Sequence, residues 1–447
     1  MPGGGPSGTP DGITTDPALF ACSRGVRAHR RRALPAAPAS VRTTPSGDRF
    51  RTVAAPAAGH GTGAREATGA GHGNGTGGTA VGETDAARDE IRGQVAGTAP
   101  VPLSVLDLVA VGAGYTASDS LATSVRLAEL AERRGYHRYW VAEHHSMPAV
   151  ASSSPAVILA RLTAHTSRIR LGSGGVMLPN HAPLAVAEQF GTLEALAPGR
   201  VDLGLGRAPG TDGATAAALR RTTQLREGAD DFPEQLAELT RFLDDDFPDG
   251  HPYTRIHAVP GPVQGSAPGG VQSAARPSIW LLGSSGFSAR LAGVLGLPFA
   301  FAHHFAAGNT LPALDLYHQS FRPSAVLDSP YALIGVSTLA ADDEETAARE
   351  FRAAALNMVH LRTGRPGLIP TPETAAAYQF SPMEQEVVAS WQSNVLHGTA
   401  DLVRSELDDL QKRTGADELM LSTVGHSLAT RLRSFDLIAD AYGMPDA

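Results

Sequence analysis

Three polar residues in a row, Glu143-His144-His145, directly follow the apolar run at 139–142. Histidine is the side chain whose ordinary pKa lies near neutral pH, so His144 could exchange a proton with a bound cofactor or its oxygen adduct. Metal binding with help from the histidines at 303–304 is a second interpretation, and hydrogen-bonded loop-end histidines are a third. Adjacent residues at a strand end point to opposite sides, so the three cannot all bind one ion. We therefore favour general acid–base chemistry at His144 and expect no metal.

Two further segments have the composition of a phosphate site. The segment Gly283-Ser-Ser-Gly-Phe-Ser288 lies between an apolar run and a predicted helix, where free backbone N–H groups and serine hydroxyls bind phosphate. A serine N-cap in a tight turn would have the same pattern. Arg207 follows another apolar run, and its planar guanidinium suits phosphate, whereas the alternative is a surface arginine in a Gly-rich loop. We assign these residues to a cofactor: Gly283, Ser284, Ser285, Ser288 and Arg207.

The segment Gly172-Ser-Gly-Gly-Val-Met-Leu-Pro179 has many glycines for a central strand. Glycine weakens a strand and often marks the close approach of a ligand or of another backbone. A flat aromatic ring packed at the mouth of a barrel would use that space, and a bulge without a ligand is the alternative. The pocket around such a ring should be largely apolar. Candidates for its lining, which could equally belong to the core, are Met177, Trp280, Phe301 and Phe305.

These segments follow short apolar runs that alternate with amphipathic stretches, a pattern typical of βα units. Eight strands are predicted, at 103–108, 139–142, 169–178, 201–205, 279–282, 299–301, 331–338 and 418–421. Helices are expected between them, whereas 362–398 has no regular pattern. Eight such units predict an α/β fold of the (β/α)8 TIM-barrel type with insertions, with its functional residues at the C-terminal ends of the strands. A doubly wound open sheet is the alternative, because strand count does not prove closure.

The first hundred residues differ from the rest of the chain. Residues 59–83 are rich in Gly, Thr and Ala without a hydrophobic period, and residues 25–41 are basic and rich in Ala and Pro. Such segments cannot bury enough apolar surface to offset their ordering entropy. We predict that residues 1–100 form a disordered low-complexity tail, with a targeting segment as the alternative. Residues 101–447 are predicted to form one barrel domain.

The composition of the 447 residues narrows the classes of function. A single cysteine, Cys22, excludes disulfides within the chain and cysteine-based zinc sites. The net charge of −8 offers no basic surface for nucleic acid. The sequence contains no run of about 18 apolar residues, which a membrane-spanning helix would need. We therefore expect a cytoplasmic protein that binds neither nucleic acid nor membrane.

Five motifs occur in order along the chain: Val141–His145, Gly174–His181, Ala187–Gln189, Pro198–Arg207 and Gly296–Pro298. They resemble the bacterial luciferase-like, flavin-dependent monooxygenases, most closely the group 1 luciferase-family oxidoreductases. The resemblance extends from about Val101 to Tyr442. It implies a (β/α)8 barrel enzyme that acts on paired donors and incorporates molecular oxygen. Its cofactor would be reduced FMN, supplied by a separate flavin reductase.

The resemblance also implies roles for single residues. His144 matches the family's active-site histidine, which supports the oxygenated flavin, and Glu143 beside it is assigned to the cofactor. Gly174-Gly175 falls where the family has a non-proline cis peptide bond beneath the flavin ring.

The phosphate residues are carried over in the same way. Arg207 matches an arginine that holds the FMN phosphate, and the serines at 284, 285 and 288 fall in the family's phosphate loop. Luciferase has a glutamate where this sequence has Ser284, so the sequence departs from the family there. A mobile lid is expected within 207–230 or 362–398.

Two other functions stay open on the same barrel. One is an oxidoreductase that uses the deazaflavin F420 for hydride transfer, since FMN and F420 share a phosphorylated tail. The other is a flavin-binding protein without catalysis, against which the retained segment Glu143–His145 argues. The substrate is expected to be a small, apolar organic molecule. A homodimer is common in the family, but nothing in the sequence requires it.

Overall fold

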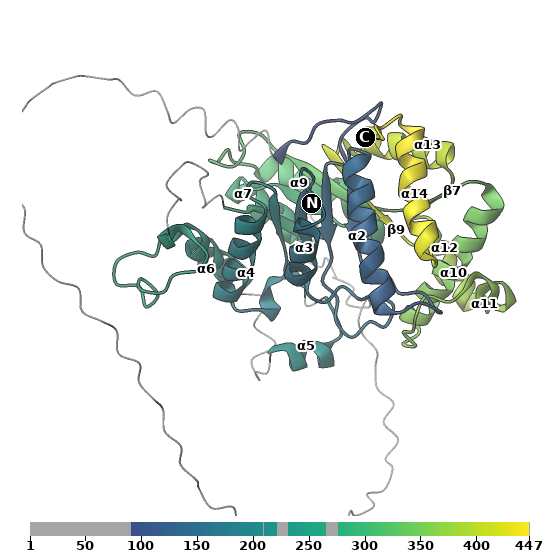
Figure 1. Ribbon diagram of the computed structural model, residues 1–447, viewed down its shortest axis with the longest axis horizontal. Coiled ribbons are helices and arrows are strands. Elements are labelled where there is room, and N and C mark those ends of the chain that lie inside the picture. The colour runs from purple at the N-terminus through teal and green to yellow at the C-terminus, as the bar shows by residue number, and fades with distance from the viewer. Residues whose placement is uncertain (1–90, 209, 221–230, 265–275, 447) are drawn as a thin grey trace, which may run out of the picture. The chain divides into compact units, whose positions relative to one another are not determined.

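The computed structural model describes residues 91–208, 210–220, 231–264 and 276–446. The tail predicted for residues 1–100 therefore lies largely outside the described residues, and so does Cys22. In the described part, parallel strands form a central sheet and helices surround it (Figure 1).

Eight strands close into a barrel. They are β1 (Leu103–Asp107), β2 (Arg138–Val141), β3 (Arg170–Met177), β4 (Val201–Gly206), β5 (Ser278–Gly283), β6 (Phe299–Phe301), β7 (Ala332–Ala341) and β9 (Glu418–Thr423). Neighbours in this order pair in parallel, β9 pairs with β1, and the pairing of β6 with β7 closes the ring. The predicted TIM barrel is confirmed. The alternative of an open sheet is wrong, because every strand of the ring is paired on both sides.

A ninth strand, β8 (Val395–Thr399), lies outside the ring. It pairs with the C-terminal half of β7, from Ser337 to Ala341, while the N-terminal half of β7 pairs with β6. The strand is followed at once by a helix, and the segment before it contains two short helices, α11 (Pro372–Ala377) and α12 (Pro382–Gln392). The prediction that 362–398 is irregular is therefore wrong. Its helices and its strand are too short to show a clear hydrophobic periodicity in the sequence.

Helices connect the strands and cover the outside of the ring. They are α2 (Ala117–Arg133), α3 (Pro155–Thr163), α4 (Pro183–Leu196), α5 (Gly213–Arg220), α6 (Phe232–Asp244), α7 (Gly286–Leu295), α8 (His303–Ala306), α9 (Thr310–Ser320), α10 (Glu344–Arg362), α13 (Ala400–Thr414) and α14 (Leu428–Ala441). Local sequence signals explain several ends. Thr116 and Asp119 form a capping box at the start of α2. Gly296 ends α7 in the left-handed conformation that glycine adopts without strain.

The interior of the ring is filled in layers. Leu106, Trp140, Trp280 and Met420 form an apolar middle layer. Below it, toward the N-terminal ends of the strands, lies a buried group of charged side chains. Arg138 donates to Asp202 and Glu418 at 2.8 Å each, and all three side chains are 0% exposed. This end of the barrel is therefore closed by paired charges.

Residues 91–99 pack against that closed end. The carbonyl of Ile91 accepts a hydrogen bond of 2.7 Å from Arg138, and Arg92 donates to the backbone of Ser329. Ile91 is 3% exposed, and Thr98 donates its backbone N–H to Tyr442. The sequence analysis placed these residues in the tail, whereas in the structure they belong to the barrel.

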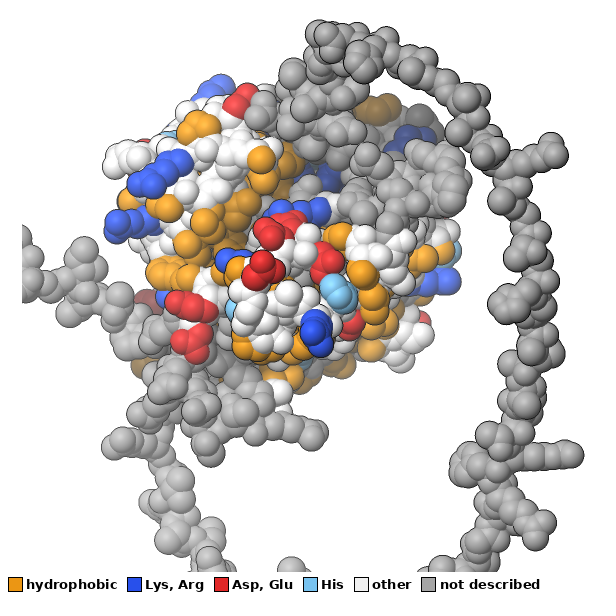
Figure 2. Space-filling view, turned by 90° about the vertical axis from the view of Figure 1, so that its left-hand side faces the viewer, with side chains coloured by type: hydrophobic (Ala, Val, Ile, Leu, Met, Phe, Trp, Pro, Cys, Tyr) orange, Lys and Arg blue, Asp and Glu red, His pale blue; other side chains and the backbone are white. Residues whose placement is uncertain are grey.

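On the face drawn in Figure 2, acidic side chains gather near the centre, with basic side chains next to them. Hydrophobic side chains lie beside both kinds there. Among the helices in the described ranges, none has the length and apolar character needed to cross a membrane.

Candidate active site

His144 lies at the C-terminal end of the barrel, directly after β2. Ala142 faces the interior with Trp140, and the alternation of side chains along a strand carries His144 to the same side. Its Nδ1 is 3.1 Å from the carbonyl oxygen of Gly210. A carbonyl only accepts hydrogen bonds, so Nδ1 carries the hydrogen and Nε2 keeps its lone pair. Burial lowers the pKa of His144, although Gly210 and Glu143 oppose this. His144 is thus a neutral hydrogen-bond acceptor at neutral pH.

Glu143 points to the other side, and both oxygens of its carboxylate accept hydrogen bonds within the protein. One carboxylate oxygen accepts from Nε2 of His145 at 2.8 Å and from Nε2 of His181 at 2.9 Å, and the other accepts from the backbone N–H of Met177 at 3.0 Å. Burial works against the charged carboxylate, but these hydrogen bonds outweigh it and lower the pKa of Glu143. The carboxylate ties the ends of β2 and β3 together. Its assignment to the cofactor stays a prediction.

A second connection holds the loop after β4 against the loop after β2. His144 donates to Gly210, and the Thr211 hydroxyl donates to the carbonyl of His145 at 2.8 Å. A side chain at Gly210 would lie 2.9 Å from the carbonyl oxygen of Glu143, and the glycine has a φ of +65°. Only glycine therefore fits this position, and the imidazole of His144 is held by a backbone of defined shape.

Arg207 and the loop between β5 and α7 come together in the structure. The guanidinium carbon lies 4.2 Å from the ring centre of Phe287, in a cation–π contact. Within the described ranges, no acidic side chain pairs with Arg207. Its charge is therefore held beside the start of α7 by an aromatic ring and not by a carboxylate.

The start of α7 leaves hydrogen-bonding groups open. Ser285 is the N-cap, and its hydroxyl makes no bond to the first helical turn, unlike an ordinary serine cap. The amide groups of that turn thus have no partner in the helix. Ser288 is 4% exposed, and its Cβ would lie 2.7 Å from a side chain placed at Gly283. Ser284 and Ser285 are thus better placed than Ser288 to meet a ligand.

The glycines of β3 let its backbone lie close to the backbone of β4 and to a side chain of β1. A side chain at Gly174 would lie 2.7 Å from Leu106, and one at Gly175 would lie 2.7 Å from the carbonyl oxygen of Gly204. The peptide bond between Gly174 and Gly175 is cis, as the resemblance implies, and the register of β3 against β4 shifts between Ser173 and Val176. The bulge of the alternative interpretation is therefore present, at the position expected to lie beneath the flavin.

Sequence reasoning gave His181 no role of its own and considered His304 only as a possible metal ligand. His181 stands in a quoted motif, but only the fold shows that it shares the carboxylate of Glu143 with His145. His304 lies after β6 and donates from Nδ1 to the carbonyl of Gly335 at 3.1 Å. The candidates for the pocket lining divide: Trp280 and Phe301 are buried in the core, whereas Phe305 is 52% exposed. In the described part of the chain, no group of three or more His, Cys, Asp or Glu side chains has the arrangement of a metal site.

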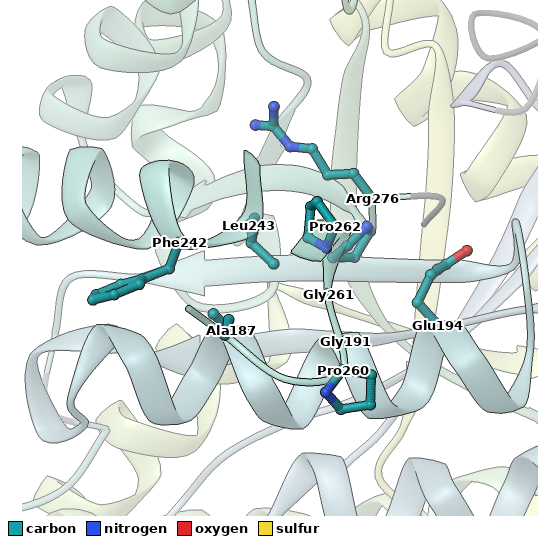
Figure 3. Close-up of a pocket in the computed structure, with 11 residues that line it drawn as sticks. Ala187, Gly191, Glu194, Phe242, Leu243, Pro260, Gly261, Pro262 and Arg276 are labelled. Carbon is teal, nitrogen blue, oxygen red and sulfur yellow. The ribbon is translucent and has the colours of Figure 1, made fainter. Parts of the chain in front are cut away.

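A separate cavity lies outside the ring, between α4 and α6 (Figure 3). Its lining includes Glu194, Phe242, Pro260 and Arg276. Arg276 precedes β5 and Glu194 lies near the end of α4, so the cavity is toward the N-terminal ends of the strands. Because barrel enzymes react at the opposite end, this cavity is not the candidate site.

Comparison with known proteins agrees with this geometry. The sequence profile described as luciferase-like monooxygenase matches residues 101–418. The chain belongs to the luciferase-like monooxygenase family. Within this family, an Escherichia coli K12 protein named luciferase-like monooxygenase is 44% identical over 340 residues, which cover 76% of this chain and 96% of that protein. The uncharacterized YvbT of Bacillus subtilis 168 is 48% identical over 76% of this chain and 96% of its own length.

A solved structure leads to the same family. The crystal structure of apo-MsnO8 is 36% identical to this chain, covers 77% of it and 98% of its own chain, and superposes with a TM-score of 0.68. Family membership makes this chain an oxidoreductase of the luciferase-like monooxygenase type. The family's barrel is also the barrel that the strand pattern predicts.

Proposed function

We propose that the protein is a flavin-dependent monooxygenase that uses reduced FMN and molecular oxygen to oxidise a small, apolar organic substrate. The observation that carries the proposal is the position of Arg207, a guanidinium without an acidic partner in the described ranges, held against the loop that begins α7. A cation and the open amides of a helix start, side by side, favour a phosphate.

The residues around this point fit FMN. Arg207 and the backbone at the start of α7 would hold the phosphate, with Ser284 and Ser285 contributing hydroxyls. The flat ring would lie against β3 at Gly174 and Gly175, where the absence of side chains lets a ligand approach the backbone closely. Reduced FMN, when bound, supplies the electrons that activate oxygen.

His144 would act as the general acid or base for the reacting group. Its Nδ1–H is held by Gly210, so Nε2 can accept a hydrogen bond or a proton from the reacting group. Glu143 would position His144 through the loops that it ties together, and its direct contact with the cofactor stays a prediction. Exposed aromatic side chains near the mouth, Phe287 at 40% and Phe305 at 52%, support an apolar substrate.

The partners follow from this chemistry and are proposals as well. A separate flavin reductase would supply the reduced FMN, and substrate and oxygen would enter at the barrel mouth. A homodimer and a cytoplasmic location remain expectations. The lid predicted within 207–230 lies partly outside the described residues. In the other candidate segment, 362–398, the backbone of Ile369 forms hydrogen bonds with Val111 and Ala113. These bonds favour a fixed segment at this position over a mobile lid.

One experiment separates the candidate functions. The purified full chain is titrated anaerobically with reduced FMN and with reduced F420, while absorbance reports binding, and oxygen uptake is then followed after mixing with air. We expect saturable binding of reduced FMN and oxygen uptake by the complex. Binding of F420 alone, without oxygen uptake, would favour hydride transfer. Both cofactors occur on this barrel fold, since one solved structure is a monooxygenase in complex with FMN and another is an F420-dependent secondary alcohol dehydrogenase. If the chain binds neither reduced FMN nor reduced F420, the proposal is rejected.

A further inference from the structure

We propose that His304 is a second catalytic histidine, which accepts a hydrogen bond at Nε2 from the reacting group held between it and His144. This inference rests on the proposed function, because it needs a reacting group at the barrel mouth. It adds a residue from the opposite wall of the barrel.

The two histidines lie at opposite points of the ring. His144 follows β2 and His304 follows β6, and in the order of the closed barrel three strands separate β2 from β6 on either side. Leu333 faces the interior, so the alternation along β7 turns Gly335 inward as well. A side chain placed at Gly335 would lie 3.0 Å from Nδ1 of His304. The imidazole therefore lies over the interior of the barrel, and glycine at 335 makes room for it.

The hydrogen bonds of the two rings are alike. In each, Nδ1 lies 3.1 Å from a backbone carbonyl oxygen, that of Gly210 for His144 and that of Gly335 for His304. Each Nδ1 must donate, so each Nε2 is an acceptor. Neither Nε2 has a hydrogen-bond partner among the residues described, and neither is an enclosed, unsatisfied atom. Within the described part of the chain, both acceptors are thus left open to a ligand.

Charge supports the same arrangement. Burial lowers the pKa of His304 to about 4, and His303 and His144 contribute in the same direction. The contribution of His144 agrees with the placement of both rings at the same mouth of the barrel, which the strand order gives. At neutral pH both are uncharged, so a donor group can approach both without meeting a cation.

His303, the neighbour of His304, provides a matched control. Its Nδ1 is 2.8 Å from the hydroxyl of Thr310, at the start of α9, and no contact with His144 or Gly335 is recorded among the described residues. The substitution His304→Asn keeps an N–H that can donate to Gly335 but removes the Nε2 acceptor. His303→Asn makes the same chemical change one residue away.

The first test needs no cofactor. Imidazole nitrogen spectra of the full chain should show the Nδ1–H tautomer for His144 and His304. His304→Asn should shift the ring signals of His144, and His303→Asn should leave them in place. Equal shifts in both variants, or none in either, would overturn the juxtaposition.

The second test uses reduced FMN and oxygen as the probe, with the first-order rate of hydrogen peroxide release as the readout. His304→Asn should speed release about tenfold, because one hydrogen bond that supports the reacting oxygen group is lost, and His303→Asn should leave the rate unchanged. His144→Asn combined with His304→Asn should differ from the product of the single effects, because both rings act on one group. Affinity for oxidised FMN should stay within about threefold of wild type.

The outcomes separate this inference from the proposed function. A wild-type rate in His304→Asn, or strictly multiplicative effects in the double variant, would overturn the role of His304 and leave the function standing. Failure of the wild-type chain to bind FMN would overturn the function and, with it, the catalytic part of this inference. The placement of the two rings would then still be decided by the nitrogen spectra.

Discussion

The two ends of the barrel use charged and titratable side chains in opposite ways. At the N-terminal end, Arg138 meets Asp202 and Glu418, and every charge is buried and paired. At the C-terminal end, Arg207 rests on an aromatic ring, and His144 and His304 each keep one ring nitrogen open. The first arrangement consumes its hydrogen-bonding capacity within the protein. The second keeps capacity for a ligand, which is why we place the reaction there.

The electrostatics of the two ends differ in the same sense. Burial disfavours the charge on Asp202, but Arg170 and Arg138 outweigh it and hold its pKa at about 2. Burial also disfavours the charge on Arg138, yet Glu418 and Asp202 raise its pKa. At the other end burial acts with little opposition, so the pKa of His304 falls to about 4. The closed end stabilises ions, whereas the open end keeps the imidazoles of His144 and His304 neutral, beside the ionised carboxylate of Glu143.

The largest effect should come from the open end. His144→Ala removes a general acid or base, and turnover should fall about 10²–10⁴-fold. Affinity for FMN should change little, because the phosphate would be held elsewhere. Stopped-flow mixing of reduced FMN, oxygen and the variant measures this. Wild-type oxidation by the variant would reduce His144 to a loop-end hydrogen-bonding residue. His145→Ala should cost less, since that ring is bound to Glu143.

The closed end should respond in stability instead. Arg138→Met leaves Asp202 and Glu418 buried without their shared cation, which should cost about 3–5 kcal/mol. Chemical denaturation, read by circular dichroism, measures the loss. Arg433→Met is the control, because its partner Asp342 is exposed, and exposed pairs contribute little. Similar losses in both variants would show that the closed end is no special support of the fold.

Residues 91–98 test how far the closed end extends. A chain that lacks residues 1–98 should be less stable than one that lacks 1–90 by about 2–4 kcal/mol, through the burial of Ile91 and its hydrogen bond to Arg138. Melting temperatures of the two shortened chains and the full chain provide the comparison. Equal melting temperatures of the two shortened chains would show that residues 91–98 add no stability and belong to the tail, as the sequence analysis predicted.

Arg207 tests the phosphate of the open end. Arg207→Ala should weaken FMN binding about ten- to a hundredfold, the effect of about 1.5–3 kcal/mol expected for a charge-assisted hydrogen bond. Riboflavin lacks the phosphate and serves as the control ligand in the same fluorescence titration. Were both ligands to lose affinity equally, Arg207 would be a structural residue.

The smallest effect is a dependence of stability on pH. The pKa of His304 is about 4 in the folded chain and near 6.5 in the unfolded one. Between these values the unfolded chain binds more protons, so stability falls as the pH is lowered. From pH 6.5 to 5 the loss from this residue should be about 1–2 kcal/mol. Denaturation of wild type and His304→Asn at both pH values should show a smaller loss in the variant. Parallel losses would place the titration elsewhere.

Much of the fold could be read from the sequence because strands and helices have local periods. The eight strands of the ring, and the positions of His144, Arg207 and the loop at 283–288 directly after them, follow from short apolar runs and their punctuation. A parallel barrel then brings all strand ends to one face. The strand β8 was missed because it is short and half-exposed.

Only the tertiary structure decided which side chains meet. Arg138 and Glu418 are separated by 280 residues and Arg138 and Asp202 by 64, yet they share one buried cluster. Likewise, Glu143 binds His181 from the loop that follows β3, and His304 donates to Gly335 on the neighbouring strand β7. Periodicity tells which side of a strand a residue lies on, but the register and closure of the sheet determine its partner. These are properties of long-range pairing, which no local pattern in the sequence contains.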